Sequence, residues 1–300
     1  MSNHDATREP ATPPAVQQLL TQSLRKHWHR HKKLRRRCRR EAAAKSVHEL
    51  RITARRLLAH LELLAVLPAS LELAKARRVL RRELRASSSL RDAQVQLRLA
   101  GQIRGAGSKL KSFRRQLRAR ERKQAEKLAL TLKPSTLAKH LRSLLKDLRH
   151  LHTGAVAERN ARTLLTRALE TKFDRMVRIQ FPATADTDGF HRARIALKKF
   201  RYLGDILQPL LESAAGLARL HRCGAIMGEV HDLDLMLTRL KDQKISGRSC
   251  ARLTRRRAAL LRSHGVFVRK YFRDDGALSG LRKTLTSLTR RRLPAAIHAQ

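Results

Sequence analysis

The apolar positions of the chain recur every three or four residues, which is the spacing of one face of an α-helix. Val47, Leu50, Ala54, Leu57 and Leu61 form the clearest such stripe. No run of residues alternates between apolar and polar in the manner of a strand. The pattern therefore predicts an all-α fold. The predicted helices cover residues 15–40, 46–67, 71–99, 108–132, 136–152, 158–180, 189–208, 213–240, 246–273 and 277–291. Within 71–99 the apolar spacing is interrupted at residues 87–89.

Two segments of the chain recur at a long period. Residues 47–57 (VHELRITARRL) return as residues 190–200 (FHRARIALKKF), and residues 90–95 (LRDAQV) return as residues 230–235 (VHDLDL). Two matching elements in the same order indicate an internal duplication. The predicted organisation is a disordered, proline-containing tail and two related helical bundles, the first of which ends near a helix stop at Gly154. Their predicted ranges are 1–14, 15–152 and 153–292.

The overall charge narrows the classes of partner. The chain of 300 residues has 68 Lys and Arg against 24 Asp and Glu, a formal net charge of +44. A compact chain this basic repels itself unless an anionic partner neutralises it, so nucleic acid, an anionic membrane surface and polyphosphate are all candidates. Aromatic residues make up only 3% of the chain. That scarcity argues against the base stacking used by single-strand binders, but it leaves a duplex-backbone binder possible.

The first repeated segment carries a basic helix face. His48, Arg51 and Arg55 lie three and four residues apart and share one face of a helix. The second copy carries the same kind of face, with His191, Arg194, Lys198, Arg201 and Tyr202. Like charges at this spacing destabilise a helix, and guanidinium groups bind phosphate oxygens through paired hydrogen bonds. A solvated basic face would explain one copy, whereas two copies in register favour an anion-binding role.

The remaining polar residues offer little catalytic or metal chemistry. We expect Asp92 and Asp232 to orient a neighbouring Arg or His or to cap a helix segment, since neither has the partner that an acid catalyst needs. The three cysteines lack zinc-site spacing, and His27, His29 and His31 cannot share one helix face. We therefore expect no metal, no cofactor and no catalytic residues. Nor do we expect a secretory signal or a membrane span, so the expected location is cytoplasmic.

The repeated segments and the Asp-containing elements after them resemble the CHAD (conserved histidine α-helical domain) family over roughly residues 15–290. The resemblance implies two antiparallel helical bundles related by pseudo-two-fold symmetry. It also implies a basic cleft between them that binds inorganic polyphosphate, and association with polyphosphate granules. A small glycine turn usually precedes the Asp in this family, which matches Gly228 but meets Ser88 in the first half. The E-x-E-x-K signature of the triphosphate tunnel domain that often accompanies CHAD is absent, which indicates a stand-alone binding domain without hydrolase activity.

By position, the resemblance assigns polyphosphate binding to the basic residues of the repeated helix and of the next helix in each half. In the first half these are His48, Arg51, Arg55, Arg56, Arg81 and Arg85. In the second half they are His191, Arg194, Lys198, Lys199, Arg201, His221 and Arg222. Two alternatives remain open at this point. The first is a nucleic-acid-binding protein of the nucleoid type, and the second is an enzyme that hydrolyses or transfers phosphate.

Overall fold

The structure, a computed structural model, describes residues 15–67, 73–103, 107–133, 136–150, 154–180, 187–211, 215–272 and 278–290. Every regular element in these ranges is a helix, which confirms the all-α fold class. The first half holds α1 (Val16–Arg40), α2 (Ala44–Leu64), α3 (Leu73–Gly101), α4 (Ser108–Thr131), α5 (Leu137–Asp147) and η1 (Leu148–His150). The second half holds α6 (Ala155–Gln180), α7 (Thr187–Leu207), η3 (Gln208–Leu210), α8 (Ala215–Asp242), α9 (Arg248–Tyr271) and α10 (Ser279–Arg290).

The helices follow the predicted ranges, with three local corrections. Helix α3 runs unbroken through residues 87–89, and α8 runs unbroken through Gly228, so neither half has a turn before its Asp. Asp92 and Asp232 therefore lie inside helices and cap neither of them. Gly154 begins a helix rather than ending one, because its carbonyl accepts the first hydrogen bond of α6 from the Glu158 amide at 3.0 Å. The predicted tail, residues 1–14, lies outside the described residues.

The apolar stripe predicted on α2 forms part of the core. Val47, Leu50, Leu57 and Leu61 are at most 1% exposed. Leu57 and Leu61 belong to a large apolar cluster that also contains Phe200 of α7. Because this cluster draws side chains from both halves of the chain, the two halves share one hydrophobic core.

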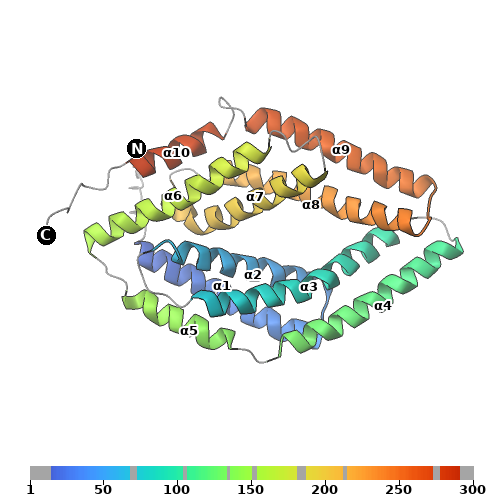
Figure 1. Ribbon diagram of the computed structural model, residues 1–300, viewed down its shortest axis with the longest axis horizontal. Helices are drawn as coiled ribbons and strands as arrows, with labels where there is room; N and C mark the ends of the chain where they lie inside the picture. The colour runs from blue at the N-terminus through green and yellow to red at the C-terminus, as the bar shows by residue number, and fades with distance from the viewer. Residues whose placement is uncertain are drawn as a thin grey trace, which may run out of the picture.

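The two halves lie against each other with α2 and α7 at the centre (Figure 1). Helices α1 and α5 cover the outer side of the first half, and α6 and α10 cover the outer side of the second. The α3–α4 and α8–α9 hairpins extend to the same end of the molecule, where their tips approach each other (Figure 1). A pseudo-two-fold axis relating the halves stays a prediction.

The hairpin tips close the molecule at that end. A second apolar cluster there joins Leu99 of α3 and Phe113 of α4 to Met236 of α8 and Leu253 of α9. The Arg252 guanidinium adds a hydrogen bond of 2.8 Å to the carbonyl of Gln102. The halves are thus held together both at the α2–α7 contact and at the tips. Along the described helices, no segment is long and apolar enough to cross a membrane.

Candidate anion-binding site

A cavity of about 590 Å³ lies between α2 and α3 of the first half and α7 of the second. We call it the inter-bundle cavity. Its lining residues are Arg55, Leu58, Ala59, Glu62, Arg77, Arg81, His191, Arg194, Ile195, Lys198, Lys199 and Tyr202. Six of these residues are Lys or Arg, and Glu62 is the single carboxylate. Since the Glu62 carboxylate already pairs with Lys172 of α6 at 2.7 Å, the cavity wall is strongly positive.

The cavity brings together basic residues from both copies of the repeat. Arg55 from the first copy lies close enough to Arg194 and Lys198 from the second copy to repel their charges. Burial is the largest of the causes that lower the pKa of Lys198 to about 7, and the charges of Arg194 and Arg55 come next. Burial likewise lowers the pKa of Arg194, with Arg55 adding to the effect. Cations held together with so little solvent are unfavourable on their own, so the site favours an anion.

Two aspartates moderate this repulsion from the α3 and α8 side. The charges of Asp92 and Asp232 both raise the pKa of Arg194, although burial outweighs them. The Asp232 carboxylate lies 4.0 Å from the guanidinium of Arg98 in the opposite half. Burial raises the pKa of Asp232 even though Arg91 and Arg98 oppose the change. These aspartates therefore balance part of the charge of the basic cluster, and their expected orienting role stays a prediction.

Arg51 has a different environment from Arg55, one turn away. Its side chain is buried, and its guanidinium donates to the Leu84 carbonyl at 2.9 Å and to Ser87 Oγ at 3.1 Å. A longer contact of 3.4 Å reaches Ser88 Oγ. The serines of α3 thus hold Arg51 between α2 and α3, and it does not line the inter-bundle cavity. Arg51 fixes the helix that carries Arg55.

Three further predicted binding residues gather around Asp205 of α7. His221 Nε2 donates to the Asp205 carboxylate at 2.8 Å, while Arg201 donates to His221 Nδ1 at 2.5 Å. Arg56 of α2 approaches the same carboxylate at 3.9 Å. Because Asp205 supplies an internal counter-charge, the charges of Arg56 and Arg201 are partly neutralised within the protein. None of the three lines the inter-bundle cavity.

The other predicted residues divide between the cavity and the surface. Arg81 lines the cavity and also a neighbouring groove along α3, which Arg85 lines as well. His191 and Lys199 lie in the cavity with exposed side chains. His48 and Arg222 are exposed and lie outside the cavity lining. Burial lowers the pKa of His48, and the charges of Arg91, Arg55 and Arg51 lower it further, so its imidazole is mainly neutral at pH 7.

Among the histidines of α1, His31 is buried in a hydrogen-bonded group between helices. Its ring contacts Thr53 Oγ1 and the Glu83 carboxylate, each at 2.9 Å, and the second oxygen of Glu83 pairs with Arg35 Nε at 2.9 Å. His31 and Glu83 are at most 1% exposed. This buried triad ties α1 to α3. Within the described part of the chain, no three His, Cys, Asp or Glu side chains are grouped to hold a metal ion.

The sequence prediction omitted several charged residues of the site. Arg77 lines the cavity beside Arg81 and was missed because α3 has several arginines of equal appearance. Glu62 and Asp205 were also missed, although each lies 14 residues after the histidine of its repeat, His48 or His191. Extending the repeat comparison along the chain would have found both acids.

Comparison with known proteins agrees with the resemblance seen in the sequence. A sequence model of the CHAD domain matches residues 20–241. Among solved structures, the chain is similar to the crystal structure of the CHAD domain from the plant Ricinus communis, with a TM-score of 0.60 and 19% sequence identity. The match covers 95% of this chain and 98% of the plant chain, and at this identity it supports the fold alone. No curated protein is similar enough to count as a match.

Proposed function

Because the chain belongs to the CHAD domain family, we propose that it binds inorganic polyphosphate in the inter-bundle cavity. The family is associated with polyphosphate-related proteins. The single observation that carries the proposal is the approach of Arg55 to Arg194 and Lys198 across the two halves, where burial lowers the pKa of both second-half cations. A chain of phosphates would replace this repulsion with charge-assisted hydrogen bonds.

The composition of the cavity supports a linear phosphate chain over nucleic acid. The lining contains no Phe or Trp and only one Tyr, Tyr202, so a row of large stacking platforms for successive bases is missing from it. Arginine and lysine contacts require nothing but phosphate oxygens. The backbone of duplex DNA also presents phosphates, and a competition experiment therefore has to separate the two.

The proposed role is binding without turnover. Within the cavity lining, the one carboxylate, Glu62, is paired with Lys172, so no carboxylate there is free to act on a phosphate. Binding of this kind would attach the protein to polyphosphate granules. Phosphate release from polyphosphate by the pure protein with divalent cations would contradict the non-enzymatic part of the proposal.

The test compares two pairs of substitutions that remove equal charge. The first pair, Arg55→Gln with Arg194→Gln, removes two positive charges from the cavity lining. The second pair, Arg115→Gln with Arg118→Gln, removes two exposed positive charges from α4. If each cavity arginine contributes one phosphate contact, the first pair should weaken binding of long-chain polyphosphate about 100-fold, about tenfold for each lost contact. The α4 pair should have a much smaller effect, because it changes only the long-range field.

The same titrations are run against duplex DNA at equal phosphate concentration and fixed salt, since salt alone changes both affinities. We expect polyphosphate to remain bound when duplex DNA is added to the wild-type protein. Easy displacement by DNA, or equal losses from the two pairs of substitutions, would overturn the proposal.

A further inference from the structure

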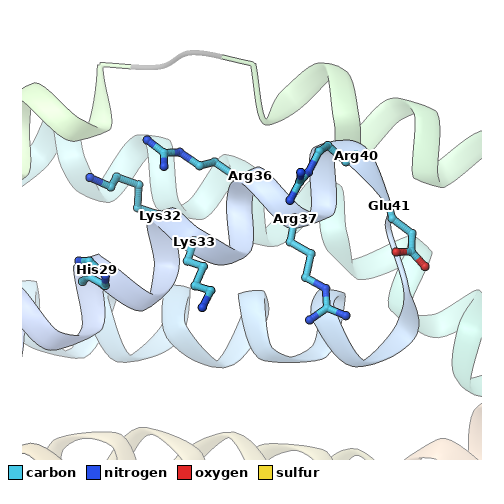
Figure 2. Close-up of a pocket in the computed structure, with 7 residues that line it drawn as sticks. All are labelled: His29, Lys32, Lys33, Arg36, Arg37, Arg40 and Glu41. Atoms are coloured by element: carbon cyan, nitrogen blue, oxygen red, sulfur yellow. The ribbon is translucent and has the colours of Figure 1, made fainter.

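Helix α1 carries a second basic surface outside the cavity. We call it the α1 face, and it consists of Lys32, Lys33, Arg36, Arg37, Arg39 and Arg40. All six side chains are exposed. In Figure 2, Lys32, Arg36 and Arg40 form one row along α1, and His29, Lys33 and Arg37 form a second row beside it. The α1 face shares no residue with the lining of the inter-bundle cavity.

Two other cations of α1, Arg30 and Arg35, pair with carboxylates, whereas the described part of the chain offers these six no such partner. Arg30 pairs with Glu49 at 3.0 Å, and Arg35 turns inward to Glu83. Among the described residues, no carboxylate lies within ion-pair distance of a side chain of the α1 face. Six like charges at spacings of three and four residues destabilise a helix when nothing neutralises them. The arrangement therefore favours an external anion.

The helix dipole explains only part of this charge. Arg37, Arg39 and Arg40 lie in the last turn of α1, where the negative end of the dipole favours cations. That effect falls off within one turn, so it does not reach Lys32 and Lys33. The nine residues from Lys32 to Arg40 span about 12 Å along the helix axis. A single phosphate contacts two or three of these side chains at most, whereas a linear polyanion can follow both rows.

The α1 face and the inter-bundle cavity lie on different helices. Helix α1 packs on α2, α4, α5 and α6, while the cavity lies between α2, α3 and α7. We propose that the α1 face is a second docking site for polyphosphate, so that one protein molecule links two chains or two distant segments of one long chain. This inference rests on the proposed function of the cavity, and it adds the linking of chains.

Isothermal titration with a short polyphosphate, long enough to fill one site but not to reach both, separates the two sites. The wild-type protein should bind two short chains. A variant with Lys32→Gln, Lys33→Gln, Arg36→Gln and Arg37→Gln should bind one, with an affinity at the remaining site within about two-fold of wild type, because distant sites act independently. The Arg55→Gln and Arg194→Gln variant should also retain one site, on α1.

Long-chain polyphosphate then tests the linking itself. Light scattering should show that the wild-type protein and long chains form large particles, because bivalent binding joins chains. The α1 variant should bind the same chains and form no such particles. A matched control removes four exposed cations from α4 through Arg115→Gln, Arg118→Gln, Arg122→Gln and Lys123→Gln. This control should keep both the two sites and the particles.

The outcomes distinguish this inference from the proposed function. If the wild-type protein binds one short chain and the α1 variant binds it unchanged, the inference fails and the cavity proposal stands. If the cavity variant keeps both sites, the cavity proposal fails. If the α1 and α4 variants lost the second site and the particles to the same extent, bulk charge would explain the binding and the inference would fail. Displacement of polyphosphate from the cavity variant by equal duplex phosphate would overturn it in favour of nucleic acid.

Discussion

Lys198 should make polyphosphate binding depend on pH above neutrality. Its pKa of about 7 in the free protein results first from burial and then from the charges of Arg194 and Arg55. A bound phosphate chain favours the protonated amine, so its pKa rises towards the ordinary value of 10.5. At pH 8 the free amine is only about one tenth protonated, and binding should take up about 0.9 of a proton.

The size of the effect follows from the same two pKa values. With complete recovery of the ordinary pKa, affinity should fall about 90-fold between pH 6 and pH 9, with most of the fall above pH 7. The sign is fixed because protonation strengthens binding, so affinity is lost as pH rises through the pKa of the free amine. Long chains are used, since the end groups of the polyanion then contribute little to the titration.

Calorimetry in buffers of different ionisation enthalpy measures this proton uptake directly. Lys198→Arg should flatten the profile between pH 7 and pH 9, because a guanidinium stays protonated in this range. Lys199→Gln is the matched control, since it removes an exposed charge from the adjacent position and should leave the slope unchanged. A slope that persists in Lys198→Arg, or a wild-type protein that takes up no proton, would refute the reasoning.

Two predictions concern stability, both measured by chemical denaturation. Glu83→Gln should lower the free energy of unfolding by about 3–5 kcal/mol, because it leaves His31 and Arg35 without their buried carboxylate. The control, Glu49→Gln at the surface pair, should lower it by less than about 1 kcal/mol. Equal losses of stability in the two variants would contradict the buried triad. Arg51→Met should cost about 2–3 kcal/mol through its lost hydrogen bonds, and Arg55→Met should leave stability nearly unchanged while weakening polyphosphate binding. The reverse pattern would mean that Arg51, rather than Arg55, is the residue that meets the anion.

The helices and the meeting of the two repeats follow directly from the sequence. The stripe from Val47 to Leu61 predicts the buried face of α2, because apolar burial dominates the choice of helix face. The duplication predicts that α2 and α7 have corresponding places, and these two helices do lie at the centre of the molecule. Local spacing was sufficient for the first conclusion, whereas the second needed the long-period repeat.

Which basic residues line the cavity, and which bind other parts of the protein, can be seen only in the tertiary structure. Arg51 and Arg55 look equivalent along α2, yet serines of α3 hold Arg51 while Arg55 enters the cavity. Spacing along one helix cannot reveal which neighbour the next helix will offer. In the same way, Asp205 accepts a hydrogen bond from His221, and only the packing of α7 on α8 brings the two side chains together.

A crystal structure of the protein with bound polyphosphate tests the central claim most directly. We expect a phosphate chain between the two halves, with its oxygens within hydrogen-bond distance of Arg55, Arg194 and Lys198. A chain bound only on outer helix faces, with the inter-bundle cavity free of phosphate, would contradict the account.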